Sequence, residues 1–277
     1  MVISVNTNAS QLLALQALNA TSRAMSVAQL RITTGLKVNG PQDNPAAFAI
    51  AQNLRGQIAG ITAVKTALSL GDATVNVAIE GATAVSDLLI EMKAKAVEAT
   101  QSGLDAASQT ALNEEFTSLR SQIVLVVGTA DFNGKNLIES GATNFNVLSS
   151  VNGSVITVSA RPIDITTLGI QTASLTNSSV AVTALAAVST AISTVSSALT
   201  ALGTAAKRIE IQQDFTGNLV DVLKEGVGNL VDADLAAETA TVQALQIKTL
   251  LGVQALSIAN SAPAAIAALL QANSLRQ

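Results

Sequence analysis

Histidine, cysteine, tryptophan and tyrosine are all missing from this sequence of 277 residues, and it holds only five phenylalanines. Without histidine or cysteine the chain has no imidazole base, no thiolate, no disulfide and no zinc site built on those ligands. Charged residues make up only 12% of the chain, and none stands in a signature of paired carboxylates or of a Ser-Lys nucleophile. The sequence therefore predicts a protein that is not an enzyme and that needs no metal and no cofactor.

The apolar residues of the chain are mostly small and aliphatic. Hydrophobic residues form 49% of the sequence but aromatic ones only 2%, so the core must consist of Ala, Val, Leu and Ile. Such side chains suit the close packing of long helices better than the walls of a deep ligand pocket. The balance of 15 basic and 19 acidic residues gives a net charge of −4, which argues against a nucleic-acid partner.

An uncharged run between Ile165 and Ala206 is long enough to raise the question of a membrane span. Serine and threonine are spread through this run, and its large apolar side chains occupy one seam of a helix rather than the whole surface. We therefore predict no membrane span, with a membrane-associated helical protein as the alternative. The first basic residue is Arg23, so the amino terminus lacks the charged start of a secretory signal.

Two long stretches repeat apolar residues at alternating spacings of three and four, which is typical of helices packed as a coiled coil. Pro45 fits the first position of the earlier helix, Asp43 or Asn44 can cap it, and Gly103 marks its expected end. The predicted seam of the earlier helix is Ile61, Val64, Leu68, Gly71, Val75, Ala78, Ala82, Val85, Leu89, Met92, Ala96 and Ala99. The predicted seam of the later helix is Leu185, Val188, Ile192, Val195, Leu199 and Leu202, continuing past Ala206 and Ile209 to Leu230.

The segment between these two helices changes from a helical to an extended pattern. A shorter helix comes first, with Leu112, Phe116, Leu119 and Ile123 on one face. Short apolar runs at 145–148, 155–158 and 163–165 then predict strands, and Asn-Gly pairs at 133–134 and 152–153 predict turns. We expect a small β-hairpin region at about 131–175, packed on a helical bundle.

Both ends of the chain also have the pattern of apolar helices. Near the start, Leu18, Met25 and Ile32 recur every seven residues and Leu12 and Leu15 extend the stripe. Near the end the stripe is Leu235, Val242, Leu245, Leu256, Ala259, Ile266 and Leu270. If the two helices met only each other, other large apolar residues would face water, and such faces indicate partners. These residues are Leu13, Leu250, Leu251, Val253, Ile258 and Leu269.

The order of elements is the same when it is taken from either end: apolar helix, long seam, variable middle, long seam, apolar helix. This order predicts a mainly α fold, a long antiparallel coiled-coil helical bundle with a small β-hairpin region and with the N- and C-terminal helices paired. Pro263 predicts a kink or a short break in the last helix. An ordinary monomeric helical bundle is the alternative that the pattern alone leaves open.

Motifs at both ends resemble a known protein family. Val5-Asn6-Thr7-Asn8 and Arg31-Ile32-Thr33-Thr34-Gly35-Leu36-Lys37-Val38-Asn39, followed by Asp43-Asn44-Pro45-Ala46-Ala47, resemble the N-terminal signature of bacterial flagellins. Val231-Asp232-Ala233-Asp234-Leu235-Ala236 and Leu251-Gly252-Val253-Gln254-Ala255-Leu256-Ser257-Ile258-Ala259-Asn260 resemble the C-terminal signature. The resemblance covers roughly 1–140 and 180–277. It is to a short flagellin of the alphaproteobacterial kind, because the middle has no room for large outer domains.

The resemblance implies a structural subunit that self-assembles into the bacterial flagellar filament for swimming motility, with terminal helices that fold on polymerisation. It implies that 1–40 and 231–277 form an inner tube and that 41–230 form the surrounding helical bundle with its hairpin. The implied subunit contacts of the inner tube are Leu12, Leu15, Leu18, Met25, Ile32, Leu235, Val242, Leu245, Leu251, Leu256, Ile258, Ala259, Ile266 and Leu270.

The same resemblance implies export and modification. The chain would leave the cell through the flagellar type III export apparatus and become part of the extracellular filament. Its partners would be copies of itself, a secretion chaperone, the filament cap and the hook-filament junction proteins. O-linked sugars occur in the family, which makes Thr143, Ser150, Thr172 and Ser178 candidate sites. A hook-filament junction protein, which usually carries a larger middle, is the alternative within this class.

Overall fold

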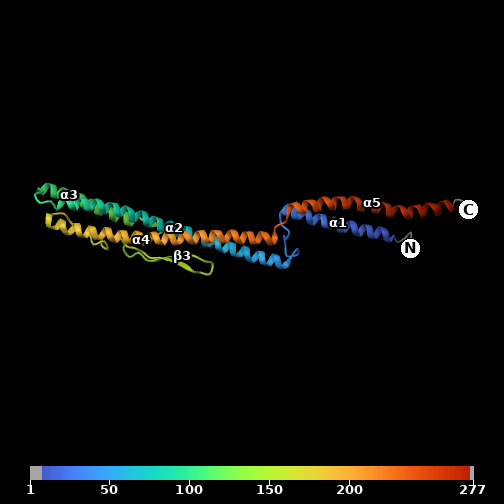
Figure 1. Cartoon of the computed structure of the whole chain (residues 1–277), viewed down its shortest axis with the longest axis horizontal. Coiled ribbons are helices and arrows are strands. Elements are labelled where there is room, and N and C mark those ends of the chain that lie inside the picture. The colour runs from blue at the N-terminus through green and yellow to red at the C-terminus, as the bar shows by residue number, and fades with distance from the viewer. Residues whose placement is uncertain (1–7, 275–277) are drawn as a thin grey trace. The chain divides into compact units, whose positions relative to one another are not determined.

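The computed structural model describes the backbone of residues 8–274 and the side chains of residues 8–261. Over this range the elements are α1 (Ala9–Thr34), α2 (Pro45–Ala99), α3 (Ala106–Thr129), β1 (Asp131–Phe132), β2 (Lys135–Asn136), β3 (Phe145–Leu148), β4 (Val155–Val158), α4 (Ser178–Val231) and α5 (Leu235–Ser274) (Figure 1). The chain divides into two compact units, Gly56–Val222 and the segments on either side of it. The predicted mainly α class is confirmed.

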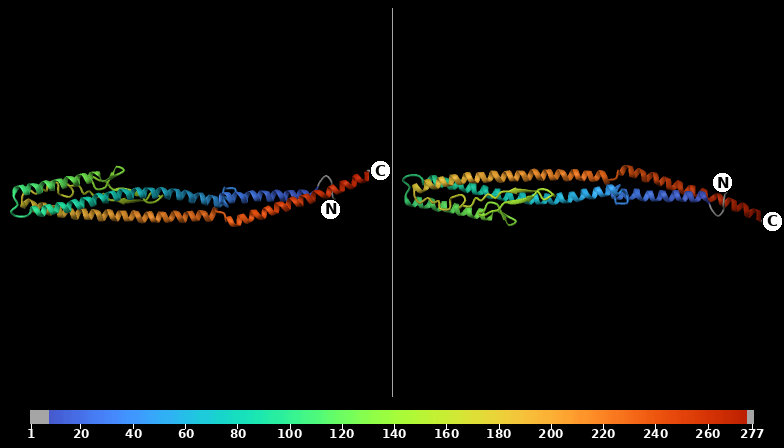
Figure 2. Two further views of the ribbon diagram at one scale, coloured as in Figure 1. Left: turned by 90° about the horizontal axis from the view of Figure 1, so that it is seen from above. Right: turned by 90° about the horizontal axis from the view of Figure 1, so that it is seen from below.

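Helix α2 supplies one side of the core of the unit Gly56–Val222. Every position of its predicted seam is buried, including Gly71. In this unit α3 and α4 run alongside α2, and α4 runs in the opposite direction to α2 (Figures 1 and 2). The helix begins as the capping pattern predicts, because Asn44 Oδ1 accepts a hydrogen bond at 3.0 Å from the N–H of Ala47 and Pro45 is the first helical residue.

The buried positions of α4 coincide only in part with the seam predicted from its largest side chains. Val188, Val195, Leu202 and Ile209 of the predicted seam are buried. Leu185, Ile192 and Leu199 are half-buried and pack against the edge of the core instead of lying at its centre. Alanines take that place, and their small side chains allow the backbones of neighbouring helices to approach closely. The buried positions are Ala181, Ala184, Val188, Ala191, Val195, Ala198, Leu202, Ala205 and Ile209.

The hairpin β3–β4 packs directly on the backbone of α2. Its strands pair antiparallel, with Val147 opposite Ile156, and both of these side chains are buried. A Cβ added at Gly71 would lie 2.6 Å from both methyl carbons of Val147. At Gly60 an added Cβ would lie 2.9 Å from Val151 Cγ1. Glycine at these two positions of α2 therefore leaves the space that the hairpin fills.

Two details of the hairpin region differ from the sequence prediction. The run 163–165 is not a strand, although the N–H of Ile163 donates to the carbonyl of Ile138 at 2.9 Å. The Asp164 carboxylate accepts hydrogen bonds from the N–H groups of Thr166 and Thr167 and turns the chain there. The Asn133-Gly134 turn joins two paired strands, β1 and β2, that the apolar pattern is too short to reveal.

Two buried amide side chains hold the loops of this unit in place. Gln109 Nε2 donates to the carbonyl of Leu175 at 2.6 Å and, more weakly, to that of Ala99 at 3.4 Å. Asn136 Nδ2 donates to the carbonyl of Val127 at 2.7 Å, and its Oδ1 accepts hydrogen bonds from two backbone N–H groups that follow it. Each amide thus satisfies backbone groups that neither a helix nor a strand pairs.

The other unit contains α1, α5 and a small apolar cluster. Val38, Ala51 and Val231 form the centre of this cluster and are almost fully buried. They come from the segment after α1, the first turns of α2 and the end of α4. Helix α5 is continuous from Leu235 to Ser274, so the short break expected at Pro263 does not occur.

Candidate assembly interface

Helices α1 and α5 lie side by side and run in opposite directions (Figures 1 and 2). Their facing residues alternate spacings of three and four, which is a heptad seam. The helices approach closely, since a Cβ added at Gly252 would lie 3.3 Å from Leu18 Cδ1. The seam consists of Ala14, Leu18, Thr21, Met25, Ala28 and Ile32 on α1 and of Glu238, Val242, Leu245, Thr249, Gly252, Leu256 and Ala259 on α5.

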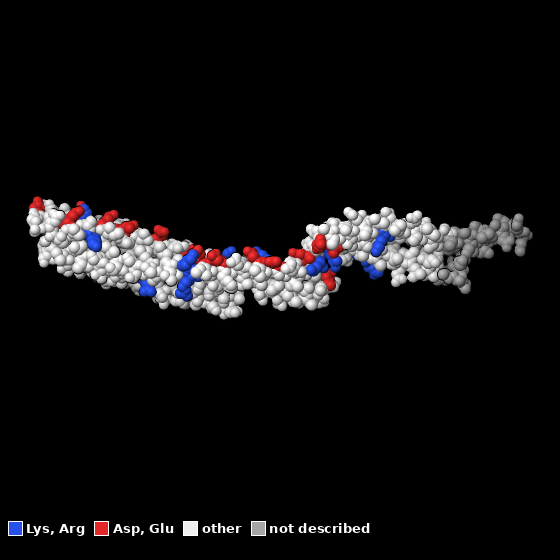
Figure 3. Space-filling view, in the orientation of Figure 1, with Lys and Arg blue, Asp and Glu red and all other residues white. Residues whose placement is uncertain are grey.

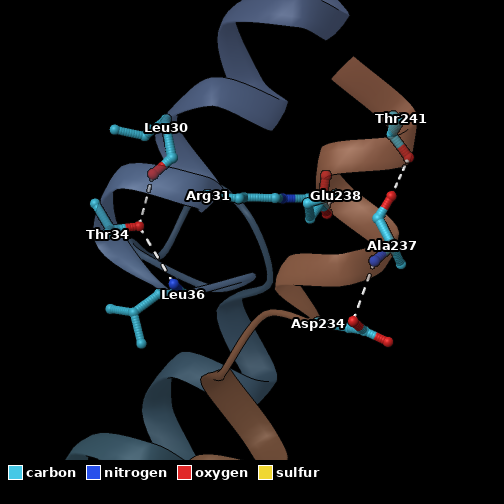
Figure 4. Close-up of polar contacts among 8 residues, drawn as sticks. All are labelled: Leu30, Arg31, Thr34, Leu36, Asp234, Ala237, Glu238 and Thr241. Carbon is cyan, nitrogen blue, oxygen red and sulfur yellow. Dashed lines mark hydrogen bonds and ion pairs between the residues drawn. The ribbon is translucent and has the colours of Figure 1, made fainter. Parts of the chain in front are cut away.

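Polar contacts join this pair at both ends of the seam. At one end Arg31 Nη1 lies 2.9 Å from Glu238 Oε1 (Figure 4). This carboxylate lies in the first turn of α5, where the helix dipole favours a negative charge. At the other end Asn8 Nδ2 donates to the carbonyl of Ala259 at 2.7 Å. The Arg31 side chain is 37% exposed, so the ion pair contributes little stability and mainly fixes the register.

Backbone hydrogen bonds connect the end of α1 to the start of α5. Gly35 has φ 72°, the left-handed conformation that ends a helix. The N–H of Ala233 donates to the carbonyl of Gly35 at 2.8 Å, and the N–H of Lys37 donates to that of Val231 at 2.7 Å. Asp234 Oδ1 accepts hydrogen bonds from N–H groups in the first turn of α5 (Figure 4). The end of α1 and the start of α5 are therefore held together by one set of hydrogen bonds.

The faces of α1 and α5 that point away from their seam are apolar and exposed. Ala28 is the only buried side chain of α1, and the described side chains of α5 include none that is buried. Leu250 is 71% exposed and Leu13 is 66% exposed. The large exposed apolar residues are Leu12, Leu13, Leu15, Val27 and Leu30 on α1 and Leu235, Ile247, Leu250, Leu251, Val253 and Ile258 on α5. Apolar surface this extensive marks an interaction site.

The predicted inner-tube contacts divide between the two sides of this helix pair. Those that face the seam and are half-buried are Leu18, Met25, Ile32, Val242, Leu245, Leu256 and Ala259. Those that are exposed are Leu12, Leu15, Leu235, Leu251 and Ile258. Ile266 and Leu270 lie outside the described side chains.

Three exposed apolar residues were named neither among those predicted contacts nor among the apolar residues expected to face water. They are Val27, Leu30 and Ile247, which stand outside the seven-residue repeats read from the sequence. In the sequence, these residues could have been recognised as contact candidates because they are large and apolar, although they do not fit the seven-residue period. A search for a single apolar stripe on each helix misses apolar residues that lie on a second face of the same helix.

The four candidate glycosylation residues differ in accessibility. Thr143 and Thr172 are exposed, although the Thr143 hydroxyl accepts a hydrogen bond from Lys135 Nζ at 2.7 Å. Ser150 and Ser178 are half-buried. The Ser178 hydroxyl donates to the carbonyl of Thr100 at 2.8 Å. Thr143 and Thr172 are therefore the more accessible of the four candidate glycosylation residues.

Among the residues whose side chains the structure describes, three helical stretches are long and apolar enough to cross a membrane by length and composition: α2, α4 and Leu235–Ser261 of α5. Their most apolar windows are buried within the chain to different extents, 39% for α2, 28% for α4 and 6% for α5. The apolar surface of α5 is thus the one that the chain itself covers least. In the described part of the chain, no three acidic side chains are grouped so that they could hold a metal ion.

Comparison with known proteins places both ends of the chain in one family. The family model for the bacterial flagellin N-terminal helical region matches residues 5–143, and that for the C-terminal helical region matches residues 185–270. Flagellin FljO of Caulobacter vibrioides is 41% identical over 267 residues, which cover 96% of this chain and 98% of that protein. A flagellin of Brucella melitensis is 34% identical over 280 residues, with coverage of 96% and 98%.

A solved structure shares the fold at low sequence identity. A protein of Vibrio parahaemolyticus described as flagellar hook-associated gives a TM-score of 0.57 at 15% identity, covering 69% of this chain and 100% of that one. The motifs at the two ends of the sequence lie within the ranges that the two family models match. The identity to flagellins extends over nearly the whole chain. This chain belongs to the bacterial flagellin family.

Proposed function

We propose that this chain is a structural subunit that polymerises into the filament of a bacterial flagellum, and that it has no catalytic role. The observation that carries the proposal is the apolar outer surface of the α1–α5 pair, where Leu13 and Leu250 are about two-thirds exposed or more. Copies of the same chain provide apolar surfaces of matching length and character. The 41% identity to a Caulobacter flagellin supports the same assignment.

The energetics favour folding of the terminal helices together with assembly. Ordering the backbone costs about 1–2 kcal/mol per residue. Full burial of a leucine, valine or isoleucine side chain returns about 1.5–3 kcal/mol. In a single chain most of the described side chains of α1 and α5 are exposed, so packing of the two helices on each other offsets little of the entropy cost. Neighbouring copies supply the missing contacts, and the terminal helices become stable on polymerisation.

We assign the inner tube of the filament to 1–40 and 231–277, and the surrounding layer to 41–230. The predicted contacts then have two roles. Leu18, Met25 and their seam neighbours hold α1 against α5 within one copy, while Leu12, Leu15, Leu251 and Ile258 contact other copies. The exposed residues Val27, Leu30 and Ile247 join this second group.

Location and partners follow from this role. The chain is exported through the flagellar type III apparatus and becomes extracellular in the filament, and it meets a secretion chaperone, the cap and the junction proteins on the way. The apolar helices contact protein rather than lipid. In α2 and α4 the apolar seam faces the core of the chain, and in α5 the exposed face is covered by neighbouring copies. The extensive identity to flagellins favours a filament subunit over a hook-filament junction protein.

Seeded polymerisation of the purified chain tests the proposal. Leu250→Gln is compared with Val155→Gln, a substitution of a 49% exposed residue in the hairpin. Polymer is measured by sedimentation and electron microscopy. We expect Leu250→Gln to raise the critical concentration about tenfold or more, because the lost burial exceeds about 1.4 kcal/mol, and Val155→Gln to leave it unchanged.

Three outcomes would contradict the proposal. The first is a wild-type chain that forms no filament on any seed. The second is equal polymerisation of the two variants. The third is flotation of the chain with lipid vesicles in place of polymerisation, which would favour the membrane alternative. Amide hydrogen exchange adds a separate test, since α1 and α5 should exchange rapidly in the monomer and become protected in the filament.

A further inference from the structure

Helix α4 presents one continuous exposed face on the side opposite its buried seam. Residues spaced by three or four along this face share nearly the same direction, because each residue turns the helix by about 100°. In chain order they are Ser197, Thr200, Thr204, Arg208, Ile211 and Phe215, all exposed. The first four are polar and the last two apolar. This face is therefore divided into a polar half and an apolar half.

The polar half forms one wall of a groove against the hairpin. Thr157, Ser159 and Arg161 line the other wall, and the volume between them is about 330 Å³. The two guanidinium groups in the groove, Arg161 and Arg208, make no side-chain hydrogen bond or ion pair with any residue that the structure describes. The neighbouring Lys207 is different, since its Nζ lies 2.8 Å from Glu210. The groove thus carries two positive charges without a local counter-charge.

The apolar half has the character of a contact surface. Phe215 is 57% exposed and Ile211, one helical turn before it, is 58% exposed. Val222 continues the same line and is 64% exposed. Phenylalanine and arginine are both enriched where proteins contact each other. A partner for this face therefore needs carboxylates to reach the groove and apolar side chains to cover Phe215.

The outer face of α2 has this chemistry. Glu80, Asp87 and Glu91 are exposed and lie within a narrow arc of the helix, opposite its buried seam. Ile90 is 56% exposed and Val97 is 47% exposed, and both lie about 80–100° around the helix from this arc, along one border of the acidic face. Figure 3 shows acidic side chains following one another over α2 and α3. Because the seam of α2 faces the core that it shares with α4, this acidic face cannot reach the groove of its own chain.

We propose that in the polymer the groove of Arg161 and Arg208, with Ile211 and Phe215, docks on the acidic outer face of α2 in a neighbouring copy. This proposal rests on the proposed filament function and names a second contact, separate from that of the terminal helices. Carboxylates of α2 enter the groove between the two guanidinium groups, and Ile90 and its neighbours cover Phe215. The contact joins two different surfaces of the chain. Each copy can therefore bind one neighbour through its groove and another through its α2 face, and the contact repeats along the polymer.

Charge reversal on each side of the contact tests this pairing. One variant carries Arg161→Glu with Arg208→Glu, and the other carries Glu80→Lys with Asp87→Lys. We expect each variant alone to need about tenfold or more higher concentration to polymerise at low salt, because like charges then face each other. A mixture of the two variants should polymerise near the wild-type concentration, since an alternating filament restores opposite charges at every contact. Lys135→Glu, which changes a half-buried charge of β2 outside both proposed surfaces, serves as control and should have little effect on polymerisation.

The outcomes separate this proposal from the filament function. If the wild-type chain forms filaments and both double variants do so at the same concentration, the contact does not exist although the filament function holds. If the two variants are each defective but their mixture stays defective, the charged faces bind something other than each other, and the proposal is wrong. Far-UV circular dichroism and a thermal melt of each monomer separate a lost contact from a lost fold.

Discussion

Replacing Gly71 by alanine would place a methyl group against the hairpin. The added carbon would lie 2.6 Å from both methyl carbons of Val147 and 3.2 Å from its Cβ, whereas carbon atoms in contact prefer about 3.5–4.0 Å. Val147 is 2% exposed and lies in a paired strand, so it has little room to move. Overpacking of this kind costs about 1–3 kcal/mol.

The helical preference of alanine acts in the opposite direction. In the interior of an exposed helix alanine is more favourable than glycine by about 1 kcal/mol. The net change for Gly71→Ala is therefore a destabilisation of about 0–2 kcal/mol. Gly203→Ala in α4 is the matched control, because an added Cβ there meets nothing within 4 Å. It should stabilise the chain by about 1 kcal/mol.

Urea denaturation of the dilute monomer, followed by circular dichroism, measures both changes. A double-mutant cycle with Val147→Ala isolates the clash, and we expect a favourable coupling of about 0.5–3 kcal/mol between the two substitutions. The urea dependence of the unfolding free energy should stay the same in all variants. If Gly71→Ala stabilises the chain as much as Gly203→Ala does, the hairpin does not rest on α2 and the argument is refuted.

Three further predictions concern the loops of the same unit. Gln109→Met should lower the free energy of unfolding by about 1–3 kcal/mol, measured by urea denaturation, because the carbonyl of Leu175 loses its buried donor. Asn136→Leu should cost about 3 kcal/mol or more in the same assay, since it leaves one carbonyl and two N–H groups unpaired. Burial raises the pKa of Asp164, but hydrogen bonds from Thr167 and its neighbour outweigh this and hold that pKa below its ordinary value of 3.8. The Asp164 carboxylate therefore stabilises the fold above the unfolded-state pKa and loses this effect as the pH falls through the lowered value, which an NMR titration of its carboxyl carbon would detect.

The seam of α2 could be predicted from the sequence because its large aliphatic residues and its alanines stand in one register. In α4 the same rule selected Leu185, Ile192 and Leu199, which flank the core. Alanines form the centre there, and a search for large apolar residues gives them little weight although they allow the closest approach of helices. In an alanine-rich helix, the size of a side chain therefore does not show whether it lies at the centre of the seam.

The terminal pair and the loops show two other limits of sequence patterns. The seam of α5 includes Glu238, Thr249 and Gly252, which an apolar repeat does not contain. Glu238 is there because Arg31 faces it, a fact that depends on the pairing of two helices far apart in the sequence. At 163–165 the apolar run predicted a strand, but hydrogen bonds to the Asp164 carboxylate impose a turn instead. Motifs at the chain ends, in contrast, indicated the family directly.

The two polar contacts at opposite ends of the α1–α5 seam limit how these helices can change in length during evolution. Deleting seven residues from one helix would preserve its apolar stripe. However, Asn8 could then no longer reach Ala259 while Arg31 meets Glu238. Viable insertions and deletions should therefore occur as matched pairs, one in each terminal helix, or in the loop at the tip of the hairpin, whose length no second helix has to match.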